Sequence, residues 1–184
     1  MTTDDGADAG AERWFFAVMP ELAEARALAG AVREALPDGY GRVVPTRRLH
    51  LTLVFLGGLA AEARSAAERA AGTVVGECFE VVLGRLGHFP GARVAWSAPM
   101  VPVPALEALA ERLADALRAH GLTPDRRPFV PHVTVARAAR RVPPRLEHRP
   151  VRWRVRDFAL VASRRESGAL VYVPVVRWPL VVLA

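Results

Sequence analysis

The stretch RLHLTLVFLG, Arg48 to Gly57, has the apolar composition of a buried strand but also carries a histidine and a threonine. Successive side chains of a strand alternate between its two faces. One face is therefore expected to hold Leu49, Leu51, Leu53 and Phe55, and the other begins with His50 and Thr52. A single histidine on a strand is most often a hydrogen-bonded structural residue, so this stretch alone does not indicate catalysis.

The stretch PHVTVARA, Pro131 to Ala138, repeats the pattern, with His132 and Thr134 on one face. The two histidines are 82 residues apart, close to half of the predicted folded portion, and each copy follows strand and helix patterns. Such internal repetition is typical of two similar structural units. We expect a pseudo-twofold arrangement that brings both histidines and both threonines to one cleft.

The order of the remaining patterns predicts an α+β fold with antiparallel sheets. Helical spacing of leucine and alanine predicts helices at 21–36, 60–75 and 103–121, the last closed by Gly121. Apolar and alternating runs predict strands at 13–20, 41–45, 49–57, 79–89, 93–99, 131–138, 151–163 and 169–182. No stretch has the composition of an interdomain linker, so residues 13–184 are expected to form one domain after a disordered acidic tail, residues 1–12.

The charge of the 184-residue chain is unevenly distributed. The net charge is +6, and removal of the four acids of the tail leaves +10 on the remainder. Twelve arginines lie between positions 126 and 165, among them Arg152, Arg154 and Arg156 on one predicted strand face. This excess favours an anionic partner such as nucleic acid. A coding bias toward arginine explains it equally well, since the chain contains no lysine, isoleucine, asparagine or glutamine.

The absence of lysine excludes the phosphate-binding lysines of P-loop enzymes and kinases, and also Schiff-base chemistry. The single cysteine, Cys78, allows no internal disulfide and no zinc-binding CxxC pair. No run is long and apolar enough for a membrane helix, which needs about 18 residues. We therefore expect a cytoplasmic protein without a membrane anchor, bound metal or cofactor.

Two histidines with two hydroxyl groups suit the cleavage of a phosphodiester. In-line attack needs a base for the nucleophile and an acid for the leaving oxygen, and imidazole serves in either role near neutral pH. Threonine hydroxyls can donate hydrogen bonds to phosphoryl oxygens, where charge builds in the transition state. The residues themselves do not decide which histidine is the acid.

The motifs HLTL and HVTV resemble the paired HxTx motifs of the 2H phosphoesterases. Their flanks are similar to those of the RNA 2′,3′-cyclic phosphodiesterases, also called 2′-5′ RNA ligases. The resemblance extends over most of the chain after the tail and includes the stretches RWFFAVMP, FPGARVAW, PFVPHVTVARA and FALVAS.

This resemblance implies a bilobal fold of two pseudo-symmetric halves, with outer helices around a central cleft. It implies hydrolysis of terminal 2′,3′-cyclic phosphates to 2′-phosphates, with His50 as proton donor, His132 as proton acceptor, and Thr52 and Thr134 holding phosphoryl oxygens. The reverse reaction would join RNA ends by a 2′-5′ linkage. RNA ends or cyclic nucleotides are the implied partners of a monomeric enzyme.

Arg137 matches an arginine that follows the second motif in this family and is expected to contact the phosphate. Strict alternation puts it on the face opposite His132, so the strand must end or bulge before it. The same offset from His50 holds Phe55, which is expected in the core.

We expect His120 to be structural and His148 to be exposed. Trp14, Phe16, Trp96 and Tyr172 are expected to be mostly core aromatics, with one or two available to stack a base.

Two other functions remain open at this level. One is a non-catalytic RNA-binding module with the same fold, although such a module would not need two imidazoles. The other is a 2H phosphoesterase for a different cyclic phosphate or RNA end.

Overall fold

The computed structural model describes residues 12–125 and 127–182, so the predicted tail lies outside it apart from Glu12. The described helices are α1 (Leu22–Ala35), α2 (Ala61–Gly72), α3 (Pro104–Ala119) and the short 3-10 helix η1 (Thr46–Arg48). The described strands are β1 (Arg13–Val18), β2 (Arg42–Val43), β3 (Leu51–Gly58), β4 (Phe79–Phe89), β5 (Val94–Pro99), β6 (Val133–Arg137), β7 (Glu147–Val155), β8 (Asp157–Glu166) and β9 (Ala169–Pro179). The predicted α+β class is confirmed.

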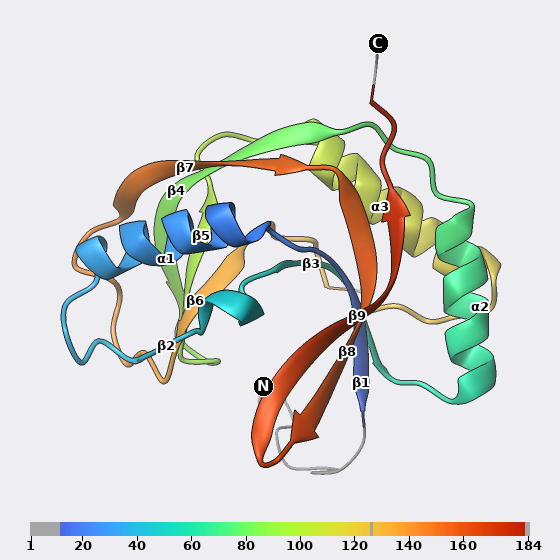
Figure 1. Ribbon diagram of the computed structural model, residues 1–184, viewed down its shortest axis with the longest axis horizontal. Coiled ribbons are helices and arrows are strands. Elements are labelled where there is room, and N and C mark those ends of the chain that lie inside the picture. The colour runs from blue at the N-terminus through green and yellow to red at the C-terminus, as the bar shows by residue number, and fades with distance from the viewer. Residues whose placement is uncertain (1–11, 126, 183–184) are drawn as a thin grey trace.

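The strands form one curled sheet in the order β7-β4-β5-β6-β3-β1-β8-β9, with β2 paired to β6 (Figure 1). All pairings between these described strands are antiparallel. The two groups of strands meet where β3 joins β6, and this junction has one residue pair, Leu51 with Val133. Both HxTx motifs therefore lie at the centre of the sheet.

The chain crosses between the two groups of strands several times. β1, the first strand, pairs with both β3 and β8, whereas β4 and β5 lie on the other side of the junction. The prediction of one strand at 151–163 is wrong, because the chain breaks at Arg156 between β7 and β8. The carbonyl of Arg156 accepts a hydrogen bond from the Leu180 amide at 2.8 Å, outside either strand ladder. The change from alternating VRWRV to the buried run FALVA marks this break in the sequence.

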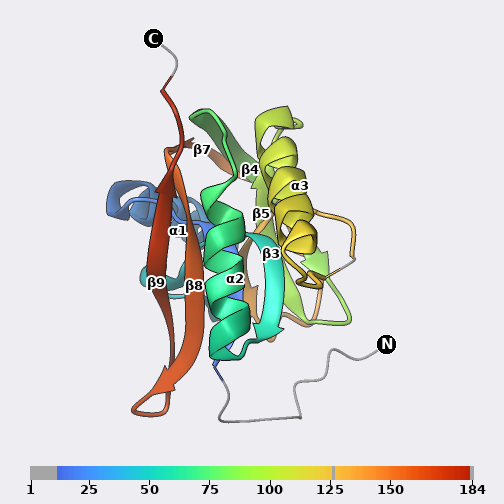
Figure 2. The same ribbon diagram turned by 90° about the vertical axis from the view of Figure 1, so that its right-hand side faces the viewer.

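The helices cover the core side of the sheet. α1 begins with a capping box between Glu21 and Glu24 and packs on β7. α2 and α3 pack together on the other group of strands (Figure 2). α3 buries Leu106, Leu109, Leu113 and Leu117 and is followed by Gly121 at φ 77°, as predicted. Leu51 and Val133 belong to this core, so their neighbours in each motif point to the opposite face.

Candidate active site

His50 lies between η1 and β3, one residue before the strand begins. Its Nδ1 is 2.8 Å from the carbonyl oxygen of Arg48. A carbonyl only accepts hydrogen bonds, so in the neutral ring Nδ1 carries the proton and Nε2 presents a lone pair. The ring is 4.9 Å from the ring of Phe15 and 4.9 Å, edge-on, from that of Tyr172. These contacts fix the orientation of the imidazole.

His132 has the same local arrangement in the second motif. It lies one residue before β6, and its Nδ1 donates to the carbonyl of Val130 at 2.7 Å. Phe89 meets its ring edge-on at 5.1 Å and also contacts Trp96 at 5.5 Å. Both histidines therefore donate to the carbonyl two residues earlier and keep Nε2 unprotonated when neutral.

The pairing of Leu51 with Val133 brings the two motifs together. In an antiparallel pair with this register, His50 lies opposite Thr134, and Thr52 lies opposite His132. The two histidines are then diagonal neighbours, a relation that leaves long side chains within reach of one another. Neither threonine hydroxyl makes a hydrogen bond to any described residue, so both are available to a ligand.

Each motif strand contains a bulge at the same position, three residues after its histidine. In β3, Val54 pairs with Phe16 and Thr52 with Ala17, so Leu53 is the extra residue. In β6, the pairs of Ala136 and Thr134 with Ala95 and Trp96 leave Val135 extra. A bulge shifts the alternation of side chains by one residue. The fifth residue after each histidine therefore returns to the face of the histidine.

These bulges put Arg137 and Phe55 on the same face as the histidines. The expectation that the strand bulges before Arg137 is confirmed, and the positive charge of Arg137 acts on His50. The prediction that Phe55 packs in the core is wrong, because Phe55 pairs with Phe15 on the site face and is 47% exposed. Since both motifs share the same offset, Phe55 could have been found by comparing them.

Burial and neighbouring positive charges disfavour the protonated histidines. Burial, together with smaller contributions from the charges of Arg137, His132 and Arg48, lowers the pKa of His50 from its ordinary 6.5 to about 4. The hydrogen bond to Arg48 opposes this shift. Burial also lowers the pKa of His132, against the hydrogen bond to Val130. Both rings are consequently neutral in the unliganded protein near pH 7.

The aromatic residues divide between the core and the site. Trp14 and Phe16 are core residues, as expected. Tyr172 instead contacts His50, and the guanidinium of Arg48 lies 5.2 Å from the Tyr172 ring centroid. Among the described residues, two buried side-chain nitrogens lack a hydrogen-bond partner, Arg48 Nε and Trp96 Nε1. Both belong to residues that flank the two histidines.

His148 differs from its sequence expectation. The sequence predicts an exposed residue, but His148 is 7% exposed in β7 and its Nε2 lies 2.7 Å from Ser97 Oγ. Its Nδ1 donates to the Arg149 carbonyl, so the Ser97 hydroxyl is the donor to Nε2. The alternating burial of β7 turns this side chain into the core. His120 caps the end of α3 through the Ala116 carbonyl, which fits a structural role.

The arginines of the stretch VRWRVRDF are not part of the site. Arg152 pairs with Glu80, and Arg156 pairs with Glu21 at the start of α1. The amide of Arg154 donates to Glu24 at 2.9 Å. The carboxylates of Glu80 and Glu21 therefore pair with the guanidinium groups of Arg152 and Arg156, whereas the guanidinium of Arg154 forms none of the ion pairs among the described residues.

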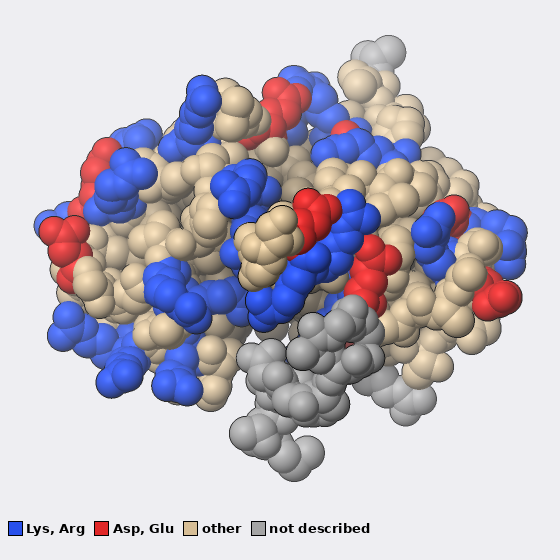
Figure 3. All heavy atoms as spheres, turned by 60° about the horizontal axis from the view of Figure 1, so that its bottom comes forward, with Lys and Arg blue, Asp and Glu red and all other residues tan. Residues whose placement is uncertain are grey.

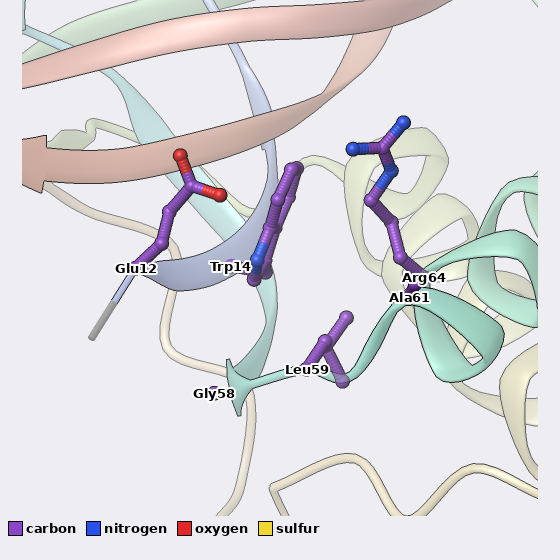
Figure 4. Close-up of a pocket in the computed structure, with 6 residues that line it drawn as sticks. All are labelled: Glu12, Trp14, Gly58, Leu59, Ala61 and Arg64. Atoms are coloured by element: carbon purple, nitrogen blue, oxygen red, sulfur yellow. The ribbon is translucent and has the colours of Figure 1, made fainter.

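Cavities alone do not identify the site. A cavity of about 460 Å³ is lined by Glu12, Trp14, Gly58, Leu59, Ala61 and Arg64 (Figure 4). It lies at the far end of β3 from His50, and Arg64 covers the Trp14 ring at 5.3 Å. Among residues 12–125 and 127–182, no cluster of three potential metal ligands occurs, and no helix is long and apolar enough to cross a membrane.

Comparisons with known proteins agree with this geometry. The RNA 2′,3′-cyclic phosphodiesterase of Escherichia coli strain K12 is 34% identical over 148 residues, which cover 78% of this chain and 82% of that protein. A crystal structure of a phosphoesterase and one of E. coli LigT complexed with 3′-AMP superpose with TM-scores of 0.85 and 0.84. Each of the two is 30% identical and covers 92% of this chain and 98% of its own. A model of the 2′-5′ RNA ligase superfamily matches residues 19–167, and the chain belongs to that superfamily.

Proposed function

We propose that this protein is an RNA 2′,3′-cyclic phosphodiesterase that opens terminal cyclic phosphates to 2′-phosphates without a metal ion. The observation that supports it most is the pairing of Leu51 with Val133, which brings His50, Thr52, His132 and Thr134 together on one face of the sheet. The E. coli relative of that name supports the same reaction.

In the proposed reaction, the two histidines act on opposite sides of the phosphorus. Nε2 of His132 takes a proton from water as the water oxygen attacks phosphorus. The bond from phosphorus to the 3′ oxygen breaks, and Nε2 of His50 donates a proton to that oxygen. The product is a 2′-phosphate with a free 3′ hydroxyl. Each Nδ1–H stays bonded to a backbone carbonyl, which stabilises the imidazolium when it forms.

Thr52 and Thr134 would donate their hydroxyl protons to the non-bridging oxygens of the phosphate. Arg137 would supply positive charge to the same group, because it lies on the site face and acts electrostatically on His50. Fixed donors of this kind stabilise charge that develops in the transition state. All three residues come from strands, whose geometry is more rigid than that of loops.

The pKa of His50 in the unliganded protein is low for a general acid. Besides burial, the positive charges of Arg137 and Arg48 contribute to the lowered pKa, and the bound phosphate anion would partly neutralise them. Binding of the substrate would therefore raise the pKa of His50 and favour the protonated form that the reaction requires. In this proposal, binding of the substrate favours protonation of His50, the residue that then donates a proton to the leaving oxygen.

The exposed face of Phe55 is the proposed contact for the base of the terminal nucleotide. Phe15 lies between Phe55 and His50, at 6.1 and 4.9 Å from their ring centroids. The fifth residue after the histidine is a cation in the second motif, Arg137, and an aromatic ring in the first, Phe55. A nucleotide offers both matching groups, an anionic phosphate and a flat base.

The test is hydrolysis of adenosine 2′,3′-cyclic phosphate in EDTA, with chromatographic separation of the 2′ and 3′ products. The wild type should form the 2′-phosphate, and His50→Ala and His132→Ala should each lose at least about a hundredfold in kcat. His120→Ala, at the exposed end of α3, is the matched control. Binding without hydrolysis by the wild type would favour an RNA-binding module. Hydrolysis of a different cyclic phosphate instead would indicate another branch of the phosphoesterases.

The partners of the protein follow from this proposal. The substrates would be RNA ends or small cyclic nucleotides, and the reverse reaction would join a 5′ hydroxyl to the cyclic phosphate by a 2′-5′ linkage. A monomeric state and a cytoplasmic location stay predictions, which gel filtration and cell fractionation would test.

A further inference from the structure

A second cavity, of about 330 Å³, lies where the chain leaves β6. It is lined by Gly39, Tyr40, Ala138, Arg140 and Arg141, which we call the outer arginine site. Ala138 directly follows Arg137, so the outer arginine site continues from the phosphate contact proposed above. β6 is five residues long, so about 15–20 Å of strand separates this site from His132.

The walls of the outer arginine site are held in place by backbone contacts. Gly41 lies so close to the end of β6 that a Cβ atom there would be 2.7 Å from the carbonyl oxygen of Arg137. The Tyr40 hydroxyl donates to the Arg141 carbonyl at 2.6 Å. The Ala139 amide donates to the Arg93 carbonyl at 2.9 Å, and Ala138 adopts a positive φ of 56°. The cavity therefore exists without a ligand.

Four arginines gather around this site without forming an ion pair with a described carboxylate. Arg42 lies directly opposite Arg137 in the β2–β6 pairing, an arrangement that is unfavourable for like charges. Within residues 12–125 and 127–182, the ion pairs use eight other arginines, namely Arg64, Arg118, Arg127, Arg149, Arg152, Arg156, Arg164 and Arg177. Arg42, Arg137, Arg140 and Arg141 take part in none of these pairs.

The distribution of charge on this face is consistent with an anion site. Figure 3 shows Arg side chains over much of this face, including its lower left part, with acidic side chains at the left edge, near the centre and at the right. The nearby Asp38 is exposed and forms no ion pair with a described arginine. Other described arginines, among them Arg69 and Arg112, also form no ion pair, but here unpaired arginines gather around one cavity that continues from Arg137. A positive surface that binds no ligand would not need a cavity whose walls are held by hydrogen bonds.

We propose that the outer arginine site binds a backbone phosphate of the RNA strand, upstream of the cyclic phosphate that reacts at His50 and His132. The inference rests on the proposed function and names its substrate class as an oligonucleotide end rather than a free cyclic nucleotide. A mononucleotide held between the histidines is too short to reach along β6 to Arg140 and Arg141. An oligonucleotide reaches both sites, and its upstream phosphate gains two guanidinium contacts.

The test compares a mononucleotide with an RNA hexamer, each ending in a 2′,3′-cyclic phosphate. The double variant Arg140→Gln and Arg141→Gln should lower kcat/KM for the hexamer roughly tenfold at low salt, with kcat unchanged. Hydrolysis of the mononucleotide should stay within about twofold of wild type. The control is Arg69→Gln with Arg112→Gln, two exposed arginines of α2 and α3 that also remove two charges. Equal losses on both substrates, or no loss on the hexamer, would overturn the proposal.

A binding measurement separates this proposal from the catalytic one. Fluorescence anisotropy with a 5′-labelled hexamer ending in a 3′-phosphate needs no turnover. The Arg140 and Arg141 double variant should bind it roughly tenfold more weakly, with a salt slope smaller by about 0.7 for each phosphate that the variant no longer neutralises. If the wild type hydrolyses neither substrate but this difference holds, the catalytic proposal fails and the outer arginine site stands. Unchanged affinity and slope in the double variant would refute the site.

Discussion

Replacement of His50 by asparagine removes a buried titratable group, so the pH dependence of stability measures how strongly the site disfavours its charged form. The folded pKa is about 4, against 6.5 for the free side chain. Between these values the unfolded chain binds more protons than the folded one, so stability falls as pH decreases below 6.5. From pH 7.5 to pH 5, this histidine alone should cost wild type about 2 kcal/mol.

Urea unfolding of wild type and His50→Asn at pH 7.5 and pH 5 tests this value. Groups common to both proteins titrate alike and cancel in the difference between the two free energies of unfolding. Relative to His50→Asn, the wild type should lose about 2 kcal/mol of stability when the pH is lowered from 7.5 to 5. Arg137→Gln should make this shift smaller, because the charge of Arg137 is one cause of the lowered pKa. A difference that stays constant over this pH range would refute the reasoning about His50.

Two further substitutions test the surroundings of the site. Ser97→Ala leaves His148 Nε2 buried without its donor and should destabilise the protein by about 1–2 kcal/mol in urea unfolding at pH 7.5; unchanged stability would contradict the role of this pair. Phe55→Ala should raise KM for adenosine 2′,3′-cyclic phosphate roughly tenfold without changing kcat. A ribose cyclic phosphate without a base is the control, and an equal rise in its KM would argue against stacking on Phe55.

Periodicity predicted most of the fold because the decisive patterns are local. The three helices, and the HxTx strands with their apolar inner faces, follow from side-chain spacing alone. The break at Arg156 was missed because strands β7 and β8 are both rich in β-forming residues, although the change from alternating to continuous apolar residues marks it, and the two strands also pair with different partners. Pairing at the two ends of one sheet is a long-range property that a local pattern does not contain.

Residues of the site can be predicted where both motifs have the same pattern. They cannot be predicted where their position depends on contacts between distant parts of the chain. Alternation puts His50 with Thr52 and His132 with Thr134, and the resemblance requires a bulge before Arg137. The same reasoning extends to Phe55, because the bulge at Leu53 is the counterpart of the one at Val135. The burial of His148 depends on Ser97, which lies 51 residues away in the chain.

The division of labour between the two histidines is tested most directly by a substrate whose leaving group needs no proton. In a 2′,3′-cyclic phosphate with sulfur at the 3′ bridging position, the departing thiolate is stable without protonation. If His50 is the acid and His132 the base, His50→Ala should regain most of its lost rate on this substrate, and His132→Ala should not. Rescue of His132→Ala instead would reverse the roles, and rescue of neither would contradict acid and base catalysis by this pair.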